Sequence, residues 1–428
     1  MNFKYLKLLP LLLSALLLFA GWGAVRITAS AEDSAAVTEA EATEVVTVTL
    51  NGIGAQADSD AVQISGSDLS ITEAGTYVLS GTLENGTVTV AADPEDEVQL
   101  VLNGVSIHSD SFAALYVAQA DRVVITLAEG SENRLSNGGS FTARDENNVN
   151  AAVYARDDIS FAGPGSLKIS SPGGHGIAGK DGVTVTGGAY EITAADSAIR
   201  ARDRITVADG SFSLTAGGDG LHAENTDDQT LGNVLITDGR FSITASDDAI
   251  HANTLLQIDG GSFALTAAEG LEGTYISING GDISISATDD GVNAAWKSSA
   301  YTPTVEINGG SLTIVMAEGD TDGVDSNGNL IINGGTVNIT GRSAFDYDGT
   351  AQYNGGTIIV NGQTLDTIPN QMMGGGMGPG MGGRMNGGMG PGMGPGMGPG
   401  MGNGTGEEMG PGDGMDRGRH GGMGGWRG

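Results

Sequence analysis

The chain has 428 residues, of which 73 are glycine and none is cysteine, and its formal net charge is −33 at pH 7. A charge this negative repels nucleic-acid phosphates and anionic membrane surfaces, so the composition excludes both as partners and favours cations. The absence of cysteine excludes a disulfide scaffold, a thiolate zinc site and a cysteine nucleophile.

The N-terminal residues 1–31 have the layout of a secretory signal peptide. Lys4 and Lys7 precede an apolar run over residues 8–20, and residues 29–31 (Ala-Ser-Ala) form a small-residue cleavage pattern. An uncleaved anchor is the alternative, because the apolar stretch approaches the length of a membrane span. Proline and glycine within the stretch weaken a spanning helix, so cleavage is favoured. We therefore expect an extracellular protein, secreted or associated with the cell surface, that has no membrane contact after cleavage.

The following segments give the domain organisation. Residues 32–50 are interpreted as a linker or a first strand, and residues 51–368 as one repeat domain. Residues 369–428 are rich in glycine, methionine and proline, with a methionine at every fourth position from Met373 to Met401. This composition cannot form a packed core and predicts a disordered tail. We interpret the tail as a spacer or as a contact with a surface.

Residues 51–368 repeat in a way that predicts an all-β fold. A turn that ends in glycine recurs every 20–29 residues, and a strand of alternating apolar and polar residues follows each glycine. Another strand precedes most of these glycines, and a third short strand follows the next turn. Three short strands per 20–22-residue coil are the unit of a right-handed parallel β-helix. The aligned glycines are Gly188, Gly210, Gly239, Gly261, Gly281, Gly310, Gly335 and Gly356.

The alignment also predicts individual positions within the solenoid. The first inward position after each glycine is occupied by Phe212, Phe241, Phe263, Ile283, Leu312, Val337 and Ile358. An internal ladder of amide hydrogen bonds is predicted at Asn279, Asn308, Asn333 and Asn354. Two coils carry extra residues, 224–232 and 295–303, at the same point, which predicts that both insertions emerge on one face.

One corner of the coils is acidic. An Asp or Glu lies eight or nine residues after most of the aligned glycines, so stacked coils bring carboxylates within about 5 Å of one another. At an effective dielectric constant near 20, two such charges repel by about 3 kcal/mol, which favours bound cations or raised pKa values. Carboxylates in short loops suit Ca²⁺, and a solvated acidic edge is the alternative. The predicted calcium ligands are Asp219, Asp247, Asp248, Asp289, Asp290, Asp322, Asp325, Asp346 and Asp348.

Two groups of residues are candidates for contact with sugar. Each member of the first group precedes an aspartate at an equivalent position in three coils, so the group forms either a neutralised ion-pair row or a cationic strip for an acidic sugar. This group is Arg156, Lys180 and Arg202. The second group lies in the insertion 295–303 and combines aromatic rings with a cation, although a tryptophan folded back as a lid is the alternative. It consists of Trp296, Lys297 and Tyr301.

Four segments carry a resemblance to a known family. They are VQLVLNGVSI (98–107), ITLAEGSENRLS (125–136), DGVDSNGNLIINGG (322–335) and FDYDGTAQYNGGTIIVNG (345–362). Over about residues 60–362 the chain resembles secreted carbohydrate-binding right-handed β-helix proteins of Gram-positive bacteria, which bind cellulose and acidic sugars such as polygalacturonate. The resemblance implies a fold similar to that of polysaccharide lyases and calcium bound by the aspartates of the last two segments.

No catalytic motif accompanies these features. The clustered bases between residues 168 and 204 stand in no recognisable motif, and His222 and His251 recur at one coil position, which stacking explains. We therefore predict a non-catalytic, calcium-dependent, extracellular protein that binds a plant-type or acidic polysaccharide such as cellulose or polygalacturonate. A polysaccharide lyase acting on uronate-containing glycans is the alternative, and a structural cell-surface adhesin is the third candidate.

Overall fold

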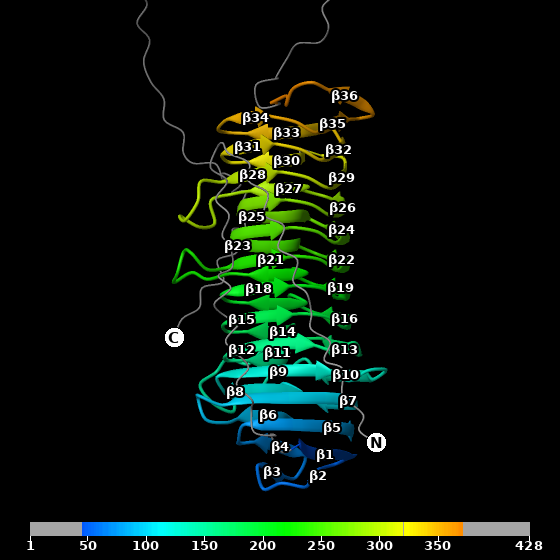
Figure 1. Ribbon diagram of the computed structural model, residues 1–428, viewed down its shortest axis with the longest axis vertical. Helices are drawn as coiled ribbons and strands as arrows, with labels where there is room; N and C mark the ends of the chain where they lie inside the picture. The colour runs from blue at the N-terminus through cyan, green and yellow to red at the C-terminus, as the bar shows by residue number, and fades with distance from the viewer. Residues whose placement is uncertain (1–44, 320, 371–428) are drawn as a thin grey trace, which may run out of the picture. The chain divides into compact units, whose positions relative to one another are not determined.

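The computed structural model describes residues 45–319 and 321–370. The predicted signal peptide (1–31) and nearly all of the predicted tail (369–428) lie outside the described residues. Within them the secondary structure consists of strands, and no helix is present that has the length and apolarity of a membrane span. The strands stack along one axis, coil upon coil (Figure 1).

Three parallel sheets, here named A, B and C, run the length of the stack, and one strand from each sheet makes up a typical coil. Because each strand pairs with its counterpart in the next coil, the coils are in register along all three sheets. The parallel β-helix predicted from the sequence is thereby confirmed.

Sheet A comprises β1 (Val45–Gly52), β5 (Gly75–Leu83), β7 (Glu97–Ser109), β10 (Glu132–Asn137), β13 (Ser166–Ser171), β16 (Ala189–Ala194), β19 (Ser211–Ala216), β22 (Arg240–Ala245), β24 (Ser262–Ala267), β26 (Asp282–Ala287), β29 (Ser311–Met316), β32 (Thr336–Thr340) and β35 (Thr357–Val360). Sheet B begins with the first halves of β1, β5 and β7, whose second halves belong to sheet A. It continues through β9 (Arg122–Leu127), β12 (Asp158–Ala162), β15 (Gly182–Val185), β18 (Arg204–Val207), β21 (Asn233–Ile236), the second halves of β23 (Asp248–Ile258) and β25 (Glu269–Ile278), β28 (Thr304–Ile307), β31 (Asn329–Ile332) and β34 (Ala351–Tyr353). Sheet C comprises β4 (Asp68–Ile71), β6 (Val88–Ala91), β8 (Leu115–Gln119), β11 (Ala151–Ala155), β14 (His175–Gly179), β17 (Ile199–Ala201), β20 (Leu221–Ala223), the first halves of β23 and β25, β27 (Val292–Ala294), β30 (Asp322–Ser326) and β33 (Ser343–Tyr347).

Antiparallel strands close both ends of the described stack. At the N-terminal end, β2 (Ala55–Ala57) pairs with β1, and β3 (Val62–Ser65) pairs with β4. At the C-terminal end, β36 (Gln363–Leu365) folds back on β35. Sheet A starts with β1 at Val45, so the first strand takes in the end of the segment interpreted as a linker or a first strand.

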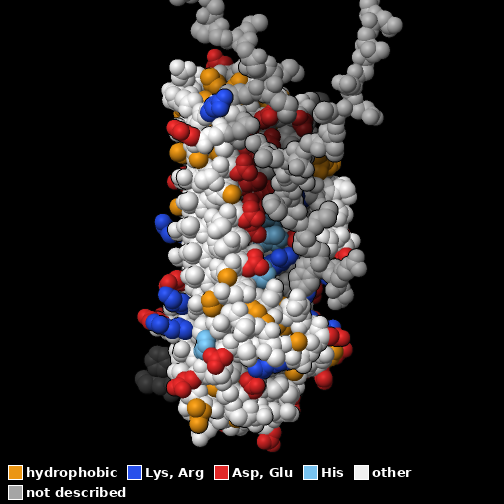
Figure 2. All heavy atoms as spheres, turned by 180° about the vertical axis from the view of Figure 1, so that it is seen from behind, with side chains coloured by type: hydrophobic (Ala, Val, Ile, Leu, Met, Phe, Trp, Pro, Cys, Tyr) orange, Lys and Arg blue, Asp and Glu red, His pale blue; other side chains and the backbone are white. Residues whose placement is uncertain are grey.

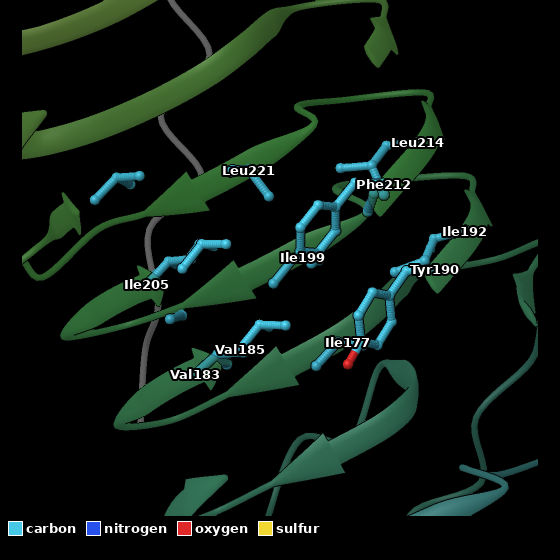
Figure 3. Close-up of a cluster of buried hydrophobic side chains, with 14 of the residues drawn as sticks. Ile177, Val183, Val185, Tyr190, Ile192, Ile199, Ile205, Phe212, Leu214 and Leu221 are labelled. Carbon is cyan, nitrogen blue, oxygen red and sulfur yellow. The ribbon is translucent and has the colours of Figure 1, made fainter. Parts of the chain in front are cut away.

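The core is built from columns of identical or similar side chains. The strand registers place the predicted inward residues of sheet A opposite one another from coil to coil, as expected from period-two alternation. The rings of Phe212, Phe241 and Phe263 stack face to face, with centroids 4.6 Å and 4.7 Å apart. Tyr190 continues the stack at 5.1 Å from Phe212, and aliphatic side chains of the other sheets surround this column (Figure 3).

The aligned glycines bend the chain into sheet A. Gly239 and Gly261 have φ values of 130° and 102°, in the region that residues with a Cβ rarely adopt. A Cβ on Gly261 would also lie 2.9 Å from the carbonyl oxygen of Gly239, in the coil below. The glycine at this turn is therefore required both by its own backbone and by the close approach of the next coil.

The asparagine ladder is present but lies on the outside. The side-chain amide of Asn308 donates to Asn279 Oδ1 at 2.9 Å, and Asn333 and Asn354 continue the chain at 2.7 Å each. All four side chains are exposed, so the prediction of an internal ladder was wrong in its location. The ladder occupies the turn between sheets B and A. There the asparagine immediately follows an inward residue, a buried isoleucine or the partly buried Tyr353, and therefore points outward.

Candidate carbohydrate and cation site

Two columns of polar side chains run along the outer face of sheet C. We name as the strand column the residues that occupy one outward position in consecutive coils, namely Arg200, His222, His251, Glu272, Asn293, Asp325 and Asp346. The corner column lies three residues earlier in each coil, where the chain enters sheet C, and contains Asp219, Asp248, Glu269, Asp290 and Asp322. Figure 2 shows the acidic side chains gathered along this face, with histidine side chains next to them.

Two side chains of the corner column accept hydrogen bonds from the backbone of the next coil. The backbone N–H of Asp248 donates to Asp219 Oδ1 at 3.0 Å, and that of Asp322 donates to Asp290 Oδ1 at 2.9 Å. Each of these carboxylates therefore anchors the start of the next strand of sheet C. This structural role explains why an acid recurs at the corner. The second carboxylate oxygen is available for another partner, which in Asp219 is His222.

The middle of the face holds a histidine cluster, formed by Asp219, His222, Asp248, His251 and Glu272. The two imidazole rings stack with centroids 4.5 Å apart and 4° between their planes. His222 Nδ1 lies 2.5 Å from Asp219 Oδ2, while His251 Nδ1 lies 2.9 Å from Asp248 Oδ2 and 2.6 Å from Glu272 Oε2. His251 is thus held between carboxylates of both columns, whereas His222 contacts Asp219 of the corner column and its Nε2 lies 3.4 Å from Glu224 Oε2.

The carboxylates set the protonation of the histidine cluster. Burial lowers the pKa of His251, but the hydrogen bonds to Asp248 and Glu272 outweigh it and raise that pKa to about 10. Burial would raise the pKa of Glu272, but the hydrogen bond with His251 outweighs it and lowers that pKa to about 2. The second oxygen of Glu272 pairs with Lys297 Nζ at 2.6 Å. At neutral pH the cluster therefore contains an imidazolium and an ionised glutamate.

Two carboxylates of this cluster and the adjacent Asp247 together have the geometry of a cation site. Asp219, Asp247 and Asp248 each offer one oxygen, and these three oxygens lie within 4.8 Å of one another. Ligands of one Ca²⁺ ion, at 2.3–2.6 Å from it, can be separated by at most about this distance. Asp247 is exposed, so an ion held here would keep coordination positions open to solvent. The other group that is equally close among the described residues, Asp248, His251 and Glu272, is buried and includes a protonated imidazole.

The C-terminal coils crowd acids without an intervening base. We name Glu269, Asp290, Asp322, Asp325 and Asp346 the acid cluster. Burial, reinforced by neighbouring carboxylates, raises the pKa of Glu269 to about 8 and that of Asp325 to about 7. The buried Oδ1 atoms of Asn293 and Asp346 have no hydrogen-bond partner among the described residues. Oxygen atoms in this state are suited to a cation or a proton.

The remaining two predicted calcium ligands lie apart from these groups. Asp289 is exposed beside Asp290 at the corner. Asp348 follows the far end of β33, so sheet C separates it from the corner column. Neither belongs to a group of three close ligands among the described residues.

The two insertions meet on one side of sheet C, as predicted (Figure 1). Ser298 Oγ, in the second insertion, donates to the carbonyl oxygen of Gln229, in the first, at 2.6 Å. The backbone N–H of Ser299 donates to Gln229 Oε1 at 3.0 Å. Together they form a wall at the edge where sheet C turns toward sheet B, next to the histidine cluster.

The structure assigns different surroundings to the three aromatic and cationic residues of the second insertion. The side chain of Trp296 is 63% exposed, which excludes the alternative of a lid folded over the coil. Lys297 instead turns inward to Glu272, and the ring of Tyr301 packs against Tyr275 with centroids 5.3 Å apart. Trp296 is therefore the member of this group that is most open to solvent.

The three basic candidates, Arg156, Lys180 and Arg202, stack from coil to coil as predicted, but their surroundings differ. Hydrogen bonds from the backbone N–H groups of Lys180 and Arg202 to the preceding coils place Arg156, Lys180 and Arg202 above one another. Arg202 forms an ion pair with Asp227 of the first insertion. Arg156 has no ion pair among the described residues and borders a cavity that is described below.

Comparison with known proteins identifies the family. A family model with the description carbohydrate-binding domain-containing protein matches residues 65–320 and again residues 269–367. The chain belongs to this carbohydrate-binding family.

Two relatives of known sequence or structure agree with this assignment. A carbohydrate-binding domain-containing protein of Acetivibrio thermocellus is 34% identical over 137 residues, which are 32% of this chain and 48% of the relative. The chain thus spans about half the length of this curated relative. The solved structure of a polysaccharide lyase-like protein from C. thermocellum, a gadolinium derivative, matches with a TM-score of 0.50 and 30% identity over 56% of this chain and 94% of that one. The predicted likeness of the fold to polysaccharide lyases is confirmed.

Several residues of the site in this member of the family were not predicted from the sequence. Glu272 and Asn293 were not considered as ligands. Glu269 was recognised as part of the acidic corner but was not among the predicted ligands, and the histidines were explained by stacking alone. A usable pattern was present, because an acid followed three residues later by a polar residue recurs in DGLHA, DAIHA, EGLEG, DGVNA and DGVDS. The third residue of each segment is the Leu, Ile or Val that points into the core from sheet C.

The ionised pair in the histidine cluster predicts a pH dependence of stability for the metal-free protein. The pKa of His251 is about 10 in the folded state and 6.5 when unperturbed, so its protonation stabilises the fold fully below pH 6.5. This stabilisation is lost as the pH rises toward 10. We expect the difference in melting temperature between wild type and His251→Gln, measured in chelator, to shrink steadily between pH 6.5 and 10. A difference that stays constant over this range would contradict the assignment of the imidazolium.

Proposed function

We propose that this protein binds an extracellular polysaccharide through calcium held at the acidic corner of sheet C, without cleaving it. The observation that carries the proposal is the group Asp219, Asp247 and Asp248, whose oxygens are close enough for one ion and in part open to solvent. Trp296 stands exposed on the insertion that borders the same face. Membership of the carbohydrate-binding family supports a polysaccharide as the partner, and the predicted signal peptide supports an extracellular location.

Calcium resolves the electrostatic conflict between this protein and an acidic sugar. A chain with a net charge of −33 repels a polyuronate such as polygalacturonate. A divalent ion with open coordination positions reverses the local charge and accepts oxygens from protein and sugar together. The related lyase-like protein was solved as a gadolinium derivative, and gadolinium, like calcium, is a hard cation that prefers oxygen ligands. This supports an oxygen-lined cation site in the shared fold.

The acid cluster extends the proposal along the solenoid axis. Burial, reinforced by the neighbouring carboxylates, raises the pKa of Asp290 to about 6 and that of Asp325 to about 7, which favours neutralisation of these groups by a proton or a cation. The unpartnered oxygens of Asn293 and Asp346 would complete the coordination of a further ion. We propose that Asp289, Asp290, Asp322 and Asp325 bridge additional calcium ions to the acidic groups of a glycan chain that lies along sheet C.

The proposal is tested by binding of polygalacturonate with and without chelator at low salt, on protein shown by circular dichroism to remain folded. We expect chelator to abolish binding and added calcium to restore it. Retention of full binding in chelator would overturn calcium bridging. It would indicate that the acidic sugar binds the cationic strip of Arg156, Lys180 and Arg202 instead. Such binding would also weaken steeply with salt, because exposed ion pairs are screened beyond about 8 Å at physiological ionic strength.

Trp296→Ala is expected to weaken glycan binding at least tenfold, or about 1.4 kcal/mol, without changing the melting temperature. The reason is that the exposed indole offers an apolar face to a pyranose ring while making no core contact. Isothermal titration with the bound glycan measures the effect. Val315→Ala, at an exposed apolar position on sheet A, serves as the control and should leave affinity unchanged. Equal affinity of Trp296→Ala and wild type would make the loop purely structural.

A polysaccharide lyase is the second candidate, and one observation favours it. Lyases need a base that removes the proton α to the uronate carboxylate beside a metal, and Lys297 lies next to the proposed calcium site. However, the pairing of Lys297 Nζ with Glu272 outweighs the effect of burial and raises the lysine pKa, so the amine remains protonated and is a poor base. Binding without cleavage is therefore preferred. Absorbance of an unsaturated product, formed from polygalacturonate, would instead establish the lyase.

A further inference from the structure

A third insertion, residues 138–150, covers the outer face of sheet C in the N-terminal coils. Phe141 and Val149 from this insertion pack with Tyr116 and Tyr154 into a small hydrophobic cluster that is separate from the main core. The insertion leaves sheet A after β10 and joins sheet C at β11, so it occupies the corner that carries the acids in later coils. It therefore replaces the acidic corner with an aromatic one.

Polar contacts fix the tip of this insertion. Tyr116 Oη donates to Asp145 Oδ2 at 2.5 Å and accepts from Asn147 Nδ2 at 2.8 Å. Next to Asp145, the Arg144 guanidinium lies 4.4 Å from the centre of the Phe112 ring and forms an ion pair with Asp68 at 3.1 Å. The side chains at the tip are thus held in place before any ligand arrives, which reduces the entropic cost of binding.

A cavity of about 550 Å³ lies between this tip and the ends of β6, β8 and β11. Its volume falls within the range of small-molecule sites and suits one or two sugar residues. Two alanine side chains contribute the apolar part of the lining, and the rest is polar. The lining residues are Ala91, Ala118, Gln119, Asp145, Glu146, Asn147 and Arg156.

The cavity contains hydrogen-bonding capacity that the protein itself does not use. Arg156 is exposed and has no ion pair among the described residues, although Asp145 lies near enough for the guanidinium to lower the carboxyl pKa. Tyr154 Oη is buried and has no hydrogen-bond partner in the described part of the chain. It too lies within electrostatic range of Asp145 and Arg156. Tyr154 does not line the cavity, so the unused hydrogen-bonding capacity within it is that of the Arg156 guanidinium.

We propose that this cavity binds a neutral sugar residue of a glycan, at a site separate from the calcium corner. Vicinal hydroxyl groups both donate and accept hydrogen bonds, so they match a lining in which Arg156 donates, Glu146 accepts, and the Gln119 and Asn147 amides do both. A uronate carboxylate would instead face the like charges of Asp145 and Glu146. The inference rests on the proposed function in that the ligand is a carbohydrate, but it needs no calcium.

The test measures calorimetric binding of a neutral oligosaccharide, cellohexaose, in chelator, and of oligogalacturonate in calcium. We expect wild type to bind cellohexaose without calcium and Arg156→Gln to weaken this binding at least tenfold. Arg134→Gln is the matched control, because Arg134 is exposed on sheet A without an ion pair among the described residues, and it should bind like wild type. Oligogalacturonate binding should be the same for all three proteins.

The outcomes separate this proposal from the calcium proposal. If cellohexaose does not bind, or binds Arg156→Gln as tightly as wild type, the neutral-sugar cavity is overturned, whatever polygalacturonate does. If Arg156→Gln no longer binds oligogalacturonate but still binds cellohexaose, Arg156 belongs to the cationic strip that binds acidic sugar. The proposal is then likewise overturned. Loss of calcium-dependent binding in Asp247→Asn with cellohexaose binding retained would support two independent sites.

Discussion

Asp247→Asn is expected to lower the affinity for calcium at least tenfold, or by about 1.4 kcal/mol, and to abolish polygalacturonate binding at limiting calcium. The substitution removes a full charge from the three-carboxylate group while preserving the size and one oxygen of the side chain. Asp247 is the exposed member of the group, so its replacement breaks no buried contact. Asp219 and Asp248, by contrast, hold backbone and histidine partners, and their replacement would confuse metal loss with misfolding.

Calcium titration followed by calorimetry, together with the calcium-induced rise in melting temperature, measures this effect. An ion that binds only the folded state stabilises it by mass action, so the rise should be reduced in the variant. Asp282→Asn removes the same charge from an exposed position on sheet A, and it should behave as wild type. If Asp247→Asn and Asp282→Asn bind calcium equally well, the ion is not held by the group Asp219, Asp247 and Asp248.

Phe241→Ala is expected to lower the free energy of unfolding by about 3–5 kcal/mol. Phe241 is fully buried, and its ring stacks between Phe212 and Phe263 at 4.6 Å and 4.7 Å. Its removal leaves a cavity that neighbouring coils cannot fill, because the sheet registers above and below hold the backbone in place. The two adjacent rings also lose their stacking partner.

Chemical denaturation monitored by far-ultraviolet circular dichroism measures the shift of the unfolding midpoint. Ser242→Ala, the next residue on the same strand, faces solvent and should change stability by less than about 0.5 kcal/mol. A shift for Phe241→Ala as small as that of Ser242→Ala would mean that the coils relax around the cavity. The ring column would then contribute little to the cohesion of the solenoid.

Much of the architecture follows from local sequence rules. Period-two alternation and the glycine of each turn identified the strands of sheet A and their inward residues. This worked because a shift of one residue would turn the whole apolar column toward solvent, so the sequence permits only one register. The common site of the insertions could likewise be read from the repeat. The asparagine ladder was misplaced because alignment reports which residues stack but not whether the shared position faces inward.

The candidate site was less predictable, since its chemistry depends on contacts between coils. The acids were found by composition, but the pairing of His251 with both Asp248 and Glu272 joins residues from two coils and two columns. Lys297 was predicted to face a sugar, whereas its partner Glu272 lies 25 residues earlier in the chain. No local pattern encodes such a contact. The same holds for the insertion 138–150, whose path across sheet C is set by tyrosines of other strands.

The hairpins at the two ends of the described stack protect edges of its terminal strands. Every internal coil presents a ladder of N–H and C=O groups to its neighbour, and an unprotected final coil would offer the same ladder to another molecule. The strands β2, β3 and β36 run antiparallel to the sheets they join and so interrupt the parallel pattern. Without them the solenoid would be a template for open-ended growth, like one segment of a cross-β fibre. With them, the outer edges of β1, β4 and β35 are already paired within the chain.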